Sequence, residues 1–136
     1  MPHYRLPKEN NQYYLPKYTF RTVVNFCFQY HELKEQLASI DGWHSGNNDG
    51  MPHGTGTSDP VANDAIRRAE IQKKIDIIEE SVMECTDEVT YPFFLQAITE
   101  ENHGYEFINR NVQVPMNGKE FSKVRRKIYY TIAHKI

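Results

Sequence analysis

Residues 104–136 read GYEFINRNVQVPMNGKEFSKVRRKIYYTIAHKI, and their pattern predicts a short helix, a turn and a longer helix. The short helix is expected from Tyr105 to about Asn111. Asn117 then has the position of an N-terminal cap, with Glu120 three residues later as in a capping box. The second helix carries apolar residues at helical spacing: Phe121, Val124, Ile128 and Ile132. One side of this helix should therefore face a core, and the order of elements is typical of a helix-turn-helix unit.

The other side of this second helix is strongly basic. Its candidate DNA contacts are Lys119, Ser122, Lys123, Arg125, Arg126, Lys127 and Tyr130. The first turns of a recognition helix approach base edges in the major groove, whereas later and bordering residues meet phosphates. The residues expected in the groove are Lys119, Ser122, Lys123 and Arg126, and those expected at phosphates are Arg125, Lys127 and Tyr130. The competing interpretation is an ordinary solvated face on a terminal helix.

The division of charge along the chain favours the DNA-binding interpretation. Residues 104–136 carry seven basic and two acidic side chains, a balance of +5, although the whole chain has a net charge of −2. Residues 61–103 carry four basic and ten acidic side chains, a balance of −6, and residues 1–60 carry five and six. A basic end on an otherwise acidic protein is the electrostatic footprint expected of a nucleic-acid-binding element.

Two longer helical patterns precede this unit. The first covers residues 16–40, with an apolar stripe at Phe20, Val23, Val24, Cys27, Tyr30, Leu33, Leu37 and Ile40. The second covers residues 60–84 after a cap at Asp59. Its apolar stripe is Ala62, Ala65, Ala69, Ile71, Ile75, Ile78 and Val82. Residues 41–59 hold five of the seven glycines and predict a loop, so the two helices are expected to form an antiparallel hairpin.

A further helix is expected between the hairpin and the C-terminal unit. Thr90 and Pro92 predict its start, and Gly104 is expected to cap its end after His103. The sequence therefore predicts an all-α protein with two units. Residues 1–85 should form an N-terminal tail and the long helical hairpin, and residues 86–136 should form the helix-turn-helix unit.

The sequence carries no constellation typical of an enzyme or of a cofactor site. His44, Asp49 and His53 share the glycine-rich loop, but no helix or strand fixes their spacing, so we expect no metal there. The segment HGTGTSDP, residues 53–60, lacks the preceding strand and the following lysine of a phosphate-binding loop. No nucleophile, base and orienting group occur together, so no catalytic residue and no cofactor is expected.

Two further groups of residues have one structural and one functional interpretation. Glu79, Glu80, Glu84, Asp87 and Glu88 are expected to form a solvated acidic face, and the alternative is a contact for a basic partner. Tyr13, Tyr14 and Tyr18 lie among basic residues and are expected to cover the end of the helical core. The alternative for these tyrosines is bracing of nucleic acid.

Composition also indicates the compartment. No stretch approaches the roughly 20 apolar residues that cross a membrane, and the first residues lack the apolar run of a signal peptide. Cys27 and Cys85 are isolated in the sequence, so reduced thiols are expected. We therefore expect a cytoplasmic protein with no membrane contact.

Three stretches resemble a known group of proteins. They are LPKENNQYYLPKYTFRTVVNFCFQYHELK at residues 6–34, DGMPHGTGTSDPVANDAIRRAEI at residues 49–71 and EFSKVRRKIYYTIAHKI at residues 120–136. The chain resembles the phage-encoded RinA/ArpU-type late transcription regulators, which are similar to region 4 of sigma factors. The resemblance implies a helix-turn-helix with Ser122, Lys123, Arg125 and Arg126 at matching positions of the recognition helix. The turn departs from the pattern, because it contains Pro115 and Gly118 and is longer than a tight helix-turn-helix turn.

These observations predict a DNA-binding transcriptional regulator that reads double-stranded DNA with its basic C-terminal helix. The hairpin could support a homodimer, and RNA polymerase could be a further partner. One alternative is a phage protein-interaction module that binds a host polymerase, nuclease or defence complex, as an anti-CRISPR does. Another is a small terminase-like packaging component.

Overall fold

A computed structural model describes residues 11–46 and 60–136, and all the regular elements in these ranges are helices. The elements are α1 (Lys17–Phe28), α2 (Tyr30–Gly46), α3 (Pro60–Cys85), α4 (Tyr91–Thr99), α5 (Tyr105–Asn111) and α6 (Gly118–Ala133). The predicted all-α class is confirmed. None of the helices in the described ranges is long and apolar enough to cross a membrane.

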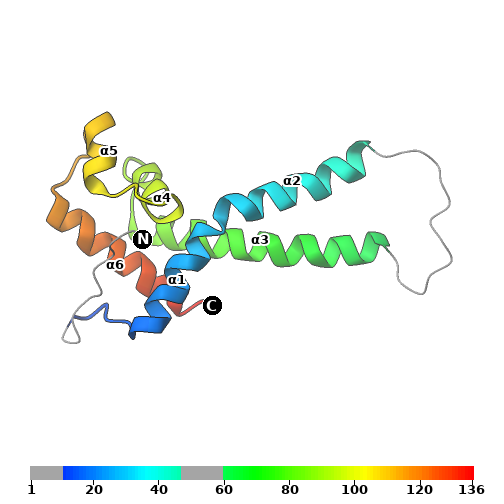
Figure 1. Ribbon diagram of the computed structural model, residues 1–136, viewed down its shortest axis with the longest axis horizontal. Coiled ribbons are helices and arrows are strands. Elements are labelled where there is room, and N and C mark those ends of the chain that lie inside the picture. Colours follow the sequence, from blue (N-terminus) through cyan, green and yellow to red (C-terminus); the bar gives the residue numbers. More distant parts are fainter. Residues whose placement is uncertain (1–10, 47–59) are drawn as a thin grey trace.

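The helices form a body with a projecting arm (Figure 1). In the arm, α2 lies beside the first part of α3, and the two helices contact each other through buried side chains such as Leu33 and Ile40 on α2 and Ile71 on α3. In the body, α4 and α6 pack against the second part of α3, and α1 packs against α4 and α6. Helix α5 contacts α4 and α6. Helix α3 therefore belongs to both parts of the molecule.

The prediction of one helix over residues 16–40 is wrong. The chain turns at Gln29, whose amide donates to the carbonyl of Phe26 at 3.2 Å in a tight i to i−3 contact. The break has a packing reason, because α1 packs against α4 and α6 whereas α2 packs against α3. The apolar side chains of Phe26 and Phe28, which lie off the predicted stripe, pack against the same core. A straight helix could not reach both sets of neighbours.

The predicted apolar stripe of the second long helix is also wrong in its first part. Ala62, Ala65 and Ala69 are exposed, whereas Ile71 and Ile75 are buried. Alanine favours helix formation through its backbone and adds little area to a contact, so it does not by itself indicate a buried face. The bounds of this helix, Pro60–Cys85, agree with the prediction.

Two predicted boundaries are displaced. Helix α2 continues to Gly46, so the first residues of the expected loop 41–59 are helical, and residues 47–59 lie outside the described residues. Gly104 is not the C-terminal cap of α4, because α4 ends at Thr99 and Gly104 is the N-terminal cap of α5 in extended backbone geometry. The left-handed backbone of this connection is found at Asn102, with a φ of 63°. Asparagine tolerates that conformation better than most residues.

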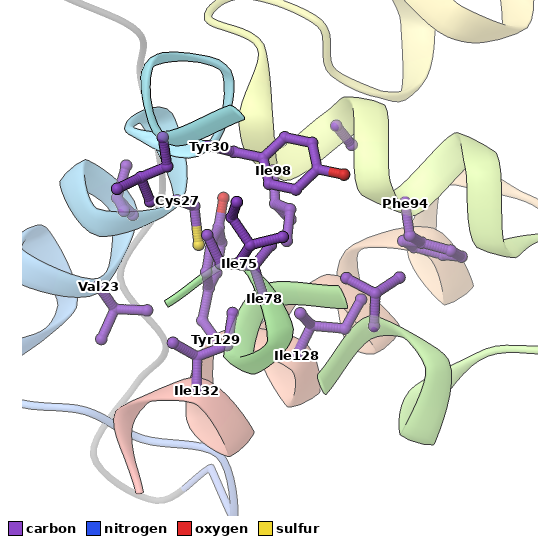
Figure 2. Close-up of a cluster of buried hydrophobic side chains, with 14 of the residues drawn as sticks. Val23, Cys27, Tyr30, Ile75, Ile78, Phe94, Ile98, Ile128, Tyr129 and Ile132 are labelled. Carbon is purple, nitrogen blue, oxygen red and sulfur yellow. The ribbon is translucent and has the colours of Figure 1, made fainter. Parts of the chain in front are cut away.

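One apolar core joins the helices of the body (Figure 2). Phe94 of α4 stacks on Phe121 of α6 with ring centroids 4.3 Å apart, and Phe20 of α1 meets Tyr129 of α6 edge to face at 5.5 Å. The core draws on residues from both sides of the predicted boundary between 85 and 86. Cys27 lies fully buried in it, and burial raises the pKa of its thiol. Both Cys27 and Cys85 are free thiols.

A reciprocal cap between Asp87 and Thr90 precedes α4. The Thr90 amide donates to a carboxylate oxygen of Asp87 at 2.8 Å, and the Asp87 amide donates to the Thr90 hydroxyl oxygen at 3.2 Å. The Thr90 hydroxyl also donates to the carboxylate at 2.9 Å. The backbone and side-chain hydrogen bonds from Thr90 lower the pKa of Asp87. The sequence pattern placed the start at Thr90 and Pro92 and missed this cap.

Replacing Phe121 by alanine should lower the free energy of unfolding by about 3–5 kcal/mol, because a fully buried aromatic ring is lost and a cavity remains. Urea denaturation followed by circular dichroism measures the change. Met83→Ala, at an exposed position of α3, is the control and should change stability by no more than about 0.5 kcal/mol. Equal effects of the two substitutions would contradict the assignment of Phe121 to the core.

The Asp87 cap predicts a specific acid sensitivity. A carboxyl whose pKa is lowered by folding stabilises the protein above its ordinary pKa of 3.8, and this contribution disappears as the pH falls through the folded pKa. Asp87→Asn keeps a hydrogen-bond acceptor but cannot titrate, so its melting temperature should fall less than that of the parent on acidification. Glu88→Gln removes the same charge outside the cap and should retain the parent's pH profile. If the melting temperatures of Asp87→Asn and the parent fall in parallel as the pH is lowered, the cap does not cause the acid sensitivity.

Candidate nucleic-acid interface

The connection between α5 and α6 is held at several points. The Tyr105 hydroxyl donates to the carbonyl of Met116 at 2.9 Å, and the Val114 amide donates to Oδ1 of Asn109 at 2.9 Å. Val114 itself is buried. At Gly118 a Cβ would lie 3.1 Å from Cδ1 of Tyr105, which is tighter than side chains usually pack. These contacts fix how α6 leaves the turn, although the turn is longer than in a tight helix-turn-helix.

Helix α6 begins at a side-chain cap and presents its apolar side to the core. Oδ1 of Asn117 accepts a hydrogen bond from the Glu120 amide at 2.8 Å, which satisfies one of the free N–H groups at a helix start. Phe121, Ile128 and Ile132 are fully buried. The predicted cap and the predicted inward stripe are confirmed at these positions, so the orientation of the helix about its axis is set by packing.

The predicted contact residues of α6 divide between an outward face and a flank. Lys119, Lys123 and Lys127 are exposed, and Arg126 is half-buried beside them. We call these four residues the basic face. Within residues 11–46 and 60–136, none of the ion pairs involves a member of the basic face. No carboxylate of the described residues therefore lies within ion-pair distance of these four side chains.

The acidic side chains of α3 contact cations elsewhere. Glu84 pairs with Lys135, near the end of the chain, at 2.8 Å. Glu79 lies 3.7 Å from Lys34 and accepts a hydrogen bond from the hydroxyl of Tyr30. Burial and the neighbouring Glu79 carboxylate raise the pKa of the Tyr30 hydroxyl. Two residues of the expected solvated acidic face, Glu79 and Glu84, thus link α3 to α2 and to the C-terminal residues. Neither forms an ion pair with the basic face.

Tyr130 lies at the C-terminal edge of the basic face and has aromatic neighbours. Its ring centroid lies 5.6 Å from that of Tyr13 and 4.3 Å from the ring of His134. Tyr130 is half-buried in this arrangement. The segment before α1 therefore reaches the edge of the predicted interface, where Tyr13 meets a residue that the sequence assigned to phosphate contact.

Ser122 and Arg125 lie on the flank that faces α5. They border a surface hollow of about 590 Å³ between the start of α5 and the start of α6. We call it the α5–α6 hollow, and its lining residues are Asn102, Gly104, Tyr105, Glu106, Phe107, Arg110, Gly118, Ser122 and Arg125. Arg125 already has an interaction partner of its own.

Sequence reasoning missed Arg110 as a member of this surface. Arg110 is exposed near the end of α5 and lines the hollow together with Arg125. In the sequence, Arg110 is a single cation in a short helix. Only the packing of α5 against α6 brings it to the same surface as residues of the longer helix. Separation in the sequence therefore hid the fact that two arginines line the same hollow.

A metal site finds no support in the described part of the chain, where no group of three His, Cys, Asp or Glu side chains could hold an ion. Asp49, His53 and the side chain of His44 lie outside the described residues. The expectation that this loop holds no metal therefore stays untested.

No protein-family model, curated protein or solved structure matches this chain.

Removing the cap of α6 should destabilise the helix that carries the basic face. Asn117→Ala should lower the free energy of unfolding by about 1 kcal/mol, because the hydrogen bond to the Glu120 amide is lost. Asn117→Asp keeps an acceptor at the same position and should remain close to the parent. Chemical denaturation of the three proteins measures the difference. An Asn117→Asp protein as unstable as Asn117→Ala would show that the cap is not the cause.

Proposed function

We propose that this chain binds duplex DNA through the basic face of α6 and acts as a transcription regulator. The observation that carries the proposal is the state of the four cations Lys119, Lys123, Arg126 and Lys127. They share one side of a helix whose other side is held in the core, and none forms an ion pair with a described carboxylate. Cations in this state can neutralise phosphates without first breaking internal contacts.

The dimensions of α6 suit the major groove. An α-helix with its side chains is about 10–12 Å across, and the major groove of B-DNA is about 12 Å wide. From Lys119 to Lys127 the helix rises about 12 Å, so the basic face spans roughly two turns. Residues at the start of α6 are the ones that a helix-turn-helix brings to base edges.

The negative charge of the rest of the chain favours one orientation on DNA. Residues 61–103 have a balance of −6 and would be repelled by phosphates, whereas residues 104–136 have a balance of +5. Such a charge distribution steers one face of a protein toward a polyanion and disfavours the others. The arm formed by α2 and α3 would then point away from the duplex.

The regulatory part of the proposal depends on the resemblance described above. The basic end of this chain resembles that of RinA/ArpU-type late regulators of phages, which are similar to the DNA-binding region 4 of sigma factors. By analogy, this chain would bind upstream of phage genes and influence their transcription. RNA polymerase would be a second partner of the bound protein.

Two substitutions on the basic face test DNA binding. Lys123→Gln with Arg126→Gln should weaken binding of a target duplex at least about tenfold, since a good contact in the groove is worth roughly 1–3 kcal/mol. Fluorescence anisotropy with a duplex selected from a random library measures the affinity. The matched control is Lys73→Gln with Lys74→Gln, which removes two exposed cations from α3 and should leave affinity nearly unchanged. Unaltered affinity of the α6 variant would refute the interface.

A protein-binding module is the second candidate, and exposed apolar residues on the arm favour it. Ile66 and Val61 of α3 are 59% and 62% exposed, and exposed alanines adjoin them. Such a surface fits a second copy of the chain or a host polymerase, nuclease or defence complex. Recovery of one stoichiometric host protein after nuclease treatment, together with no DNA binding at low salt, would favour this candidate. A ring-sized oligomer in light scattering would instead favour a terminase-like component.

A further inference from the structure

The α5–α6 hollow has the composition of an anion site. Among the described residues, its lining includes two arginines, Arg110 and Arg125, and one serine, Ser122, against a single acidic residue, Glu106. Its volume of about 590 Å³ lies within the range of roughly 300–1,000 Å³ that is typical of sites for small ligands. A sugar–phosphate unit is of suitable size, and guanidinium groups recognise phosphate through paired hydrogen bonds.

Two positions shape the hollow. The Nη1 atom of Arg125 lies 4.0 Å from the position that a Cβ would take at Gly104, so the guanidinium group lies beside the start of α5. Arg125 is half-buried there, which limits the directions in which its head can point. A guanidinium group offers five N–H donors, so Arg125 can bind a phosphate while it keeps its existing contact.

The hollow adjoins the proposed DNA interface. Ser122 belongs to the hollow and is also one of the predicted groove contacts, and Arg126 of the basic face follows one turn later on α6. When a helix-turn-helix docks, the helix before the recognition helix crosses the DNA backbone. That helix is α5 in this chain. A duplex on the basic face would therefore bring one strand's backbone to the hollow.

We infer that the α5–α6 hollow receives a backbone phosphodiester of the bound duplex, held by Arg110 and Arg125 with Ser122 at its edge. This inference rests on the proposed function. It adds a sequence-independent contact on α5 that fixes the register of α6 in the groove, because phosphate contacts position a protein and base contacts specify the sequence.

Salt dependence of binding tests the inference. Each lost phosphate contact should reduce the slope of log affinity against log salt by about 0.9. Arg110→Gln and Arg125→Gln should each give this reduction and the double variant about twice as much, equally on a selected duplex and on one of mixed sequence. Lys73→Gln, on α3, is the matched control and should retain the parent's slope. Circular dichroism establishes that the variants keep their helical content.

Glu106 supplies a test of opposite sign, which does not depend on the arginine variants. Removing its charge by Glu106→Gln should tighten binding of the mixed-sequence duplex roughly two- to fivefold, as expected for one charge at a partly exposed site. Glu88→Gln removes a charge outside the hollow and should have no such effect.

The possible outcomes separate the two proposals. If the double arginine variant keeps the parent's salt slope while Lys123→Gln with Arg126→Gln loses affinity, the phosphodiester site is refuted and the DNA interface on the basic face stands. A parent that binds no duplex at low salt would overturn both. Reduced slopes in Arg110→Gln and Arg125→Gln, with tighter binding by Glu106→Gln, would support the phosphodiester site.

Discussion

The burial of one side of α6 is the constraint on which the rest of the structure depends. Phe121, Ile128 and Ile132 are removed from water by α1, α3 and α4, so the helix cannot rotate without exposing apolar area worth about 25 cal/mol per Å². Because the apolar side of α6 is buried, the cations of the basic face on the opposite side must face outward. The direction of the charged groups therefore follows from the hydrophobic effect rather than from any attraction among the polar residues.

The ion pairs of the acidic helix α3 are made with lysines outside the basic face. Glu84 and Glu79 lie on the acidic helix α3. Glu84 contacts Lys135, which follows the end of α6, and Glu79 contacts Lys34 in the first part of α2. Exposed pairs of this kind add little to stability, typically below about 1 kcal/mol. Their effect here is on the charge distribution, since carboxylates held at these positions do not approach the basic face. Helix α6 thereby keeps its basic face although it packs against the acidic helix α3.

Patterns that depend on local chemistry were predictable from the sequence, and those that depend on tertiary geometry were not. The cap at Asn117 and the inward stripe of α6 follow from side-chain hydrogen bonding and helical period, and both are present. The break at Gln29 carries no proline or glycine signal, because it arises from the different neighbours of α1 and α2. Periodicity alone places Ala62 on a buried stripe, although alanine fits either environment and the residue is exposed. Arg110 and Arg125 line the same hollow because of the way α5 and α6 pack together. The helical period of a sequence carries no information about how two helices pack.

Helix α3 passes without interruption from the arm into the body, and this continuity has a mechanical consequence. Its 26 residues make a rod of about 39 Å, with one end beside α2 and the other packed against α6. A sideways force on the free end of a rod held at its other end reaches the support as a bending moment, and packed interiors deform little under such a load. Any force on the tip of the arm would therefore reach α6 as torque, and the arm would work as a lever.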